Sequence, residues 1–78
     1  MWDEQFEVLL RKQLSFLPPD EKIQGGMELR DYGLDSLGTI ELLSGLETAY
    51  DIRFRDEALT LETFRTPDVL WKTVQSLR

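Results

Sequence analysis

Large apolar residues recur at three- and four-residue steps in three segments of this 78-residue chain, and this spacing constrains the fold more than any other feature of the sequence. It is the period of an amphipathic helix that buries one face against a core. The three segments cover residues 3–17, 37–50 and 67–77, and less regular stretches separate them. The pattern therefore predicts an all-α fold.

Capping residues indicate where the first and last helices begin. Asp3 is placed to cap the first helix, which Pro18-Pro19 should end because proline cannot continue the hydrogen-bond ladder. Thr66 is a suitable cap for the last helix, and Pro67 suits its first position. The inward stripe of this last helix is expected to contain Val69, Leu70, Val74 and Leu77, with Trp71 on a flank.

The helix predicted over residues 37–50 has two faces of different character. The face expected to lie inward contains Leu42, Leu43, Leu46, Ala49 and Tyr50. The opposite face contains Leu37, Ile40, Glu41, Ser44 and Glu47. Two large aliphatic side chains, Leu37 and Ile40, are thus expected to be exposed beside acidic neighbours. Exposure of single apolar residues is common, so this pattern alone is weak evidence for a contact surface.

A long connection, residues 18–35, leads from the first helix to the second. Ile23, Leu29 and Leu34 are expected to pin it onto the core. Loops of this length are uncommon in compact domains and are often functional. This one leads directly to Ser36.

The second connection begins with alternating residues, of which Ile52 and Phe54 are expected to turn inward. An isolated four-residue strand would have nothing to pair with, so an extended loop is expected there. A short helix is predicted over residues 59–64. The predicted architecture is a small bundle of three main helices plus this short one, in a single domain over residues 1–78.

Charge and composition exclude several classes of partner. Fifteen acidic and nine basic side chains give a net charge of −6, which argues against nucleic acid and against anionic membrane surfaces. It would favour partners with basic patches, although acidity can also serve solubility alone. The chain has no cysteine, no signal-peptide pattern and no apolar stretch long enough to span a membrane. A soluble, cytoplasmic monomer is expected.

Four interpretations compete for the pair Asp35-Ser36. A nucleophilic serine needs a general base, and the chain has no histidine, so no catalytic residue is predicted. A calcium loop starting at Asp31 fails because Gly33 and Leu42 occupy ligand positions, and no metal site is predicted. A helix cap fits, since Ser and Asp are preferred there, and spacing alone favours it. The fourth interpretation rests on a resemblance.

The stretch "YGLDSLGTIELLSGLETAYDIRF", residues 32–54, resembles the modification site of acyl carrier proteins and of peptidyl (aminoacyl) carriers. Leu29 and Gly33 complete the upstream pattern L-x-x-x-G-x-D-S-L. Downstream residues follow at the family's spacings, and the first and last helices suit its four-helix plan. The matching downstream positions are Glu41, Leu42, Leu46, Glu47, Ile52 and Phe54. The extended pattern is far more specific than the three letters DSL.

The resemblance implies an acyl-carrier-like four-helix bundle in which Ser36 receives 4′-phosphopantetheine, taken from coenzyme A by a phosphopantetheinyl transferase. Asp35 and Leu37 are its motif neighbours. The cofactor would supply the working thiol, so the carrier needs no catalytic residue. Partner enzymes would dock on the second helix. Some would load the carrier with acyl or aminoacyl groups, and others would act downstream as synthase or tailoring enzymes. Its contacts would be apolar at Leu37 and Ile40, with Asp35, Glu41 and Glu47 meeting basic residues.

Two departures from the fatty-acid carriers favour a specialised role. Gly38 stands where those carriers usually have an acidic residue, and "LETFRTPDVLW", residues 61–71, resembles the tail of aminoacyl and peptidyl carriers. We therefore expect a carrier of a polyketide or nonribosomal pathway. Met1 favours a stand-alone protein over a domain excised from a larger synthase. The alternatives are a housekeeping fatty-acid carrier and an unmodified helical adaptor. Gly38 itself is expected to be a helix defect, so that Gly38→Asp would raise the melting temperature.

Overall fold

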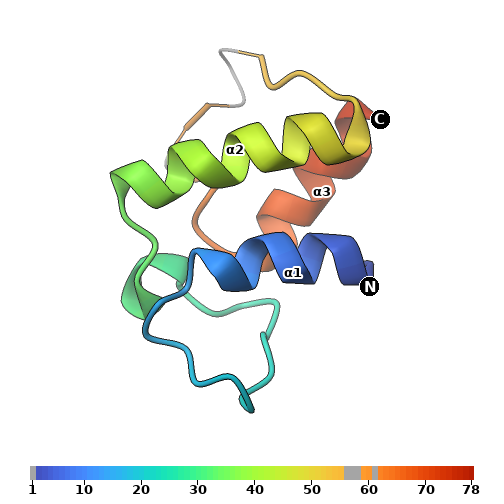
Figure 1. Ribbon diagram of the computed structural model, residues 1–78. Coiled ribbons are helices and arrows are strands. Elements are labelled where there is room, and N and C mark those ends of the chain that lie inside the picture. The colour runs from blue at the N-terminus through green and yellow to red at the C-terminus, as the bar shows by residue number, and fades with distance from the viewer. Residues whose placement is uncertain (1, 56–58, 61) are drawn as a thin grey trace.

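A computed structural model describes residues 2–55, 59–60 and 62–78. This part of the chain is all-α, as predicted, and its elements in chain order are α1 (Glu4–Lys12), the 3₁₀ helix η1 (Leu29–Tyr32), α2 (Ser36–Tyr50) and α3 (Pro67–Leu77). In Figure 1, α1 and α2 run in opposite directions, and α3 crosses behind them. No strand occurs among the described residues, and no described helix is long and apolar enough to cross a membrane.

Helix α1 begins as predicted but ends five residues earlier. Asp3 Oδ1 accepts a hydrogen bond of 2.9 Å from the Phe6 N–H, which confirms the cap. The helix ends at Lys12 and does not reach Leu17 before the prolines. One reason is a tertiary contact, because the Phe16 N–H donates to the Tyr32 carbonyl oxygen at 3.0 Å and so leaves the helical ladder.

Helix α3 confirms the sequence prediction at its start and corrects it on one face. Thr66 Oγ1 accepts from the Val69 N–H at 3.3 Å, and Pro67 is the first helical residue. Trp71, predicted on a flank, is instead buried in the core. Its ring makes a T-shaped contact with Phe6 at 4.9 Å between centroids, because α1 supplies an aromatic partner where this tryptophan lies.

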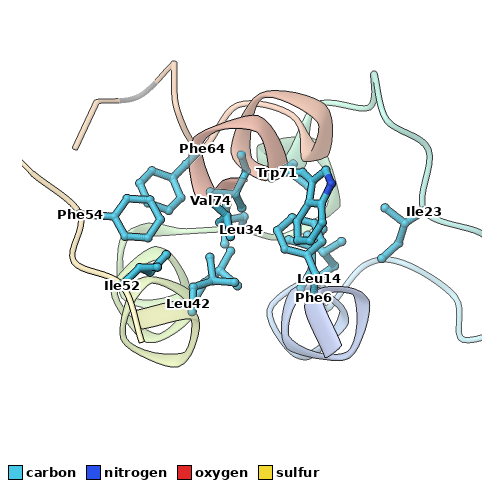
Figure 2. Packing of buried hydrophobic residues seen from close by; sticks show 14 residues of the cluster. Phe6, Leu14, Ile23, Leu34, Leu42, Ile52, Phe54, Phe64, Trp71 and Val74 are labelled. Carbon is cyan, nitrogen blue, oxygen red and sulfur yellow. The ribbon is translucent and has the colours of Figure 1, made fainter. Parts of the chain in front are cut away.

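The core lies between the three helices and draws in both connections. Figure 2 shows Phe54 and Phe64 on one side and Phe6 with Trp71 on the other, separated by aliphatic side chains. The first aromatic pair is stacked at 5.8 Å between ring centroids. The loop residues predicted as anchors are all buried, namely Ile23, Leu29, Leu34, Ile52 and Phe54. The long connection is therefore anchored to the core at Ile23, Leu29 and Leu34, and it delivers α2 in a defined place.

The short helix predicted over residues 59–64 lies partly outside the described residues, and residues 62–65 form a turn. The short helical element that the structure does describe is η1, in the connection before α2. It ends at Gly33, whose φ of 107° is a left-handed conformation that favours glycine. A Cβ at Gly33 would also lie 2.6 Å from Ser15 Oγ. This glycine turns the chain into the segment that precedes Ser36.

Candidate functional site

The N-terminus of α2 is capped by Asp35 rather than by Ser36. The Asp35 backbone is extended, and its Oδ1 accepts from the Gly38 N–H at 2.7 Å. Its carbonyl oxygen accepts from the Thr39 N–H at 2.8 Å. Ser36 is the first residue of the helix and is exposed. Its hydroxyl bonds to no group in the described part of the chain, so it remains available for reaction.

The surroundings of Ser36 favour an attached anion. The first turn of α2 contains no acidic residue, and the N–H groups of Ser36 and Leu37 precede those that Asp35 satisfies. Unpaired N–H groups and the positive end of the helix dipole stabilise negative charge at such a position. A phosphodiester on the serine oxygen would therefore lie in a favourable field.

A groove of about 730 Å³ begins beside Ser36 and runs from α2 toward the second connection. Thr39 and Ile40 line it on the α2 side, and Leu59 and Phe64 line it on the other. A flexible arm on the serine could lie in this groove or extend into solvent. The residues present thus fit a phosphopantetheine group in both charge and shape.

The residues predicted as a recognition surface lie where the sequence placed them, with one difference. Leu37 and Ile40 are 66% and 61% exposed, and Glu41 is exposed as well. Leu42 and Leu46, on the opposite face, are buried as predicted. Glu47 differs, because it is half-buried and its Oε2 accepts from the Phe54 N–H at 2.9 Å. Its carboxylate thus holds the connection after α2 as well as facing solvent.

Gly38 occupies a crowded position, which the sequence did not reveal. It is buried, and a Cβ there would lie 3.1 Å from both Asp35 Oδ1 and Gln13 Oε1. An aspartate would add a carboxylate next to that of Asp35. From this crowding we expect Gly38→Asp to lower the melting temperature in thermal denaturation, opposite to the expectation from helix propensity alone.

Two neighbours of Ser36 were absent from the sequence predictions. Arg30 lines the groove beside the serine, and Gln13 contacts α2 from the end of α1. Arg30 could have been suggested by its position, since it is a basic residue in an acidic loop just before the motif. Nothing in the segment around Gln13 indicates its contact, which depends on how α1 packs. Among the described residues, no group of three or more acidic side chains could hold a metal ion.

Comparisons with known proteins define the class of this site. The sequence profile of the family described as "Phosphopantetheine attachment site" matches residues 5–72. The chain is therefore a carrier domain for covalently attached 4′-phosphopantetheine, and it is not itself an enzyme. It belongs to the acyl carrier protein family.

Named relatives agree with this assignment. Acyl carrier protein SF2 of Brassica campestris, described as chloroplastic, is 39% identical over 54 residues, which are 69% of this chain and 40% of that protein. Acyl carrier protein 5 of Arabidopsis thaliana, also chloroplastic, is 37% identical over 54 residues, or 69% of this chain and 38% of the relative. The match thus spans about two fifths of the length of these relatives. The cytoplasmic location and the single domain over residues 1–78 therefore stay predictions.

A solved structure resembles the whole fold. It is the crystal structure of an engineered Bradyrhizobium japonicum glycine:carrier protein ligase complexed with a carrier protein from Agrobacterium tumefaciens and ATP. The superposition has a TM-score of 0.81 at 27% identity and covers 94% of this chain and 95% of the other. The acyl-carrier-like fold is thereby confirmed.

Proposed function

We propose that Ser36 carries the 4′-phosphopantetheine arm, and that the protein presents thioester-bound intermediates to partner enzymes of a natural-product pathway. The observation that carries this proposal is the Ser36 hydroxyl, which bonds to no described residue and is exposed at the first position of α2, while Asp35 does the capping. The arm supplies a thiol that forms thioesters. The chain itself supplies a rigid attachment point and a favourable field for the phosphate.

The partner surface in this proposal is the exposed face of α2 around the serine. Leu37 and Ile40 supply apolar contact area, and Glu41 together with Asp35 supplies negative charge next to it. Such a surface fits enzymes that present a basic rim around an apolar patch, beginning with the phosphopantetheinyl transferase. Glu47 belongs to the same face, but we expect a smaller contribution because one of its oxygens holds the Phe54 N–H.

The cargo we favour is aminoacyl or peptidyl. Its support is the structural likeness to a carrier that was solved with a glycine:carrier protein ligase, together with the segment of residues 61–71. A second candidate is an acyl cargo, which the names of the plant relatives and the largely apolar groove beside Ser36 favour. Holo protein offered an aminoacyl ligase with ATP and amino acids, or an acyl-loading enzyme with fatty acids, would separate the two by intact mass.

The attachment site is tested by incubating the protein with coenzyme A and a broad-specificity phosphopantetheinyl transferase, then measuring intact mass. Wild type should gain one phosphopantetheine, and Ser36→Ala should gain none. Because the Ser36 hydroxyl makes no bond in the described structure, this variant should keep its unfolding free energy within about 0.5 kcal/mol. The matched control is Ser44→Ala, an exposed serine of the same helix, which should load fully.

Two outcomes would contradict the proposal. Loading of Ser36→Ala would place the attachment elsewhere. A folded wild-type protein that gains no mass would favour the unmodified adaptor, which would use the same face of α2 without a cofactor.

A further inference from the structure

Gln13, at the end of α1, reaches across to the first turns of α2. Its Nε2 donates to Glu41 Oε2 at 3.3 Å, and its Oε1 lies 3.1 Å from the place that a Cβ on Gly38 would take. The side-chain amide of Gln13 thus lies against the space that a side chain at position 38 of α2 would occupy. Gly38 is buried beneath it.

The close approach of the two helices continues one heptad further along α2. A Cβ on Gly45 would lie 3.2 Å from Leu9 Cδ2, so a second glycine on the same stripe faces α1. Glycines at such positions let neighbouring side chains lie directly on the helix backbone. The contact of Gln13 therefore lies at the end of a seam along which α1 packs on α2.

We infer that Gln13 is a positioning residue for partner recognition. It acts by holding the carboxylate of Glu41, which lies on α2 within two turns of Ser36. This inference rests on the proposed function, because it concerns enzymes that dock around Ser36. A carboxylate held by an amide loses rotamer freedom before docking, so less entropy is lost when a basic partner binds. The partner that this arrangement fits carries an arginine or lysine opposite Glu41.

The chemistry of the site predicts which kinetic constant changes. Gln13 contacts Glu41 and the space over Gly38, and the Ser36 hydroxyl bonds to neither within the described residues. Loss of the amide should therefore weaken docking and leave the chemical step alone. One hydrogen bond between exposed groups corresponds to roughly a two- to fivefold change in affinity.

The test is a double-mutant cycle in the loading reaction with coenzyme A and the transferase, under conditions where KM reports docking. Gln13→Met keeps the length of the side chain and removes the amide, and should raise KM about two- to fivefold with kcat unchanged. In the background of Glu41→Gln the same change should have no effect. Gln5→Met, at an exposed position of α1, is the matched control and should behave as wild type.

A second variant keeps the inference testable if Gln13→Met fails to fold. Gln13→Ala removes the amide without placing a longer side chain against α2, and should give the same rise in KM. If wild type is loaded but the Gln13 variants keep its KM, the inference is overturned. It is also overturned if KM rises equally in the Glu41→Gln background, or if only kcat falls. A wild-type protein that is not loaded at all would overturn the proposed function instead, so the two failures are distinguishable.

Discussion

The two ends of α2 are held in different ways. At its C-terminal end, the Tyr50 hydroxyl donates to the Asp3 carboxylate, its ring meets Trp71 at 6.1 Å, and the Arg78 guanidinium lies 5.2 Å above that ring. At its N-terminal end, the bonds that hold the first turn come from the adjacent Asp35, and Leu37 points into solvent. One end is tied to both other helices, and the other is held by local capping and by the contact of Gln13 from the end of α1.

This difference separates stability from chemistry along a single helix. The contacts of Tyr50 with α1 and α3 lie far from Ser36, so substitutions there should change unfolding without changing modification. The residues around Ser36 should behave in the opposite way.

The largest effect should come from truncating the buried face. Leu46 is completely buried, so Leu46→Ala should cost about 2–5 kcal/mol and could unfold so small a domain. Leu37→Ala and Ile40→Ala, on the exposed face, should cost under about 1 kcal/mol and yet slow loading. Urea denaturation with loading kinetics measures both. If the exposed-face variants unfold as readily as Leu46→Ala, the assignment of the two faces is wrong.

A smaller effect is expected at the capped end. Asp35→Ala removes the bond to the Gly38 N–H and should cost about 0.5–2 kcal/mol, whereas the adjacent Ser36→Ala should be nearly neutral. The comparison is made by chemical denaturation of the two unmodified variants. Equal losses would mean that the serine shares the cap, contrary to the geometry described above.

At the tied end, Tyr50→Phe keeps the ring on Trp71 and removes the hydroxyl bond to Asp3. We expect a loss of about 0.5–1.5 kcal/mol and normal loading of Ser36. Tyr32→Phe is the matched control and should be close to wild type. Slower loading of Tyr50→Phe would show that the two ends of α2 are coupled.

The same contact predicts a dependence on acid. Burial alone would raise the pKa of Asp3, but the hydrogen bonds from Tyr50 and the Phe6 N–H, with the charge of Arg78, lower it overall. A carboxyl with a lower pKa in the folded state stabilises that state above the pKa of the unfolded chain, and the contribution is lost as pH falls through the folded value. The difference between wild type and Tyr50→Phe should therefore shrink below about pH 4 in acid titrations of stability.

The smallest effect on stability should come from salt. Raising the ionic strength screens exposed charges, so docking to Glu41 should weaken while the unfolding free energy changes little. Measuring KM for loading and the denaturation midpoint at two salt concentrations tests this. A KM that is insensitive to salt would indicate that apolar contacts at Leu37 and Ile40 dominate recognition.

The parts of the fold that follow from local chemistry could be predicted from the sequence. The caps at Asp3 and Thr66 need only residues three positions away, and the two faces of α2 follow from its period. The early end of α1 and the burial of Trp71 could not be predicted, because each depends on a partner from another element.

The candidate site divides in the same way. Ser36 and its exposed neighbours were predicted from a contiguous motif, and the structure places them at the start of α2 as expected. The crowding at Gly38 could not be predicted in full, because part of it comes from Gln13, which is far away in the sequence. Helix propensity describes a helix in isolation, whereas this glycine is defined by the helix packed against it.

The contacts of Tyr50 also have a geometric consequence for attachment. Asp3 and Arg78 both meet this residue, so the N- and C-terminal segments of the described chain converge at one end of α2, as Figure 1 shows. Ser36 lies at the other end, about 22 Å away for a helix of 15 residues. A group attached at either terminus would thus lie at the end of α2 opposite Ser36. Such a group could be a surface anchor, a reporter protein or a peptide loop that joins the two termini. Immobilised through either terminus, the domain would present the face around Ser36 outward.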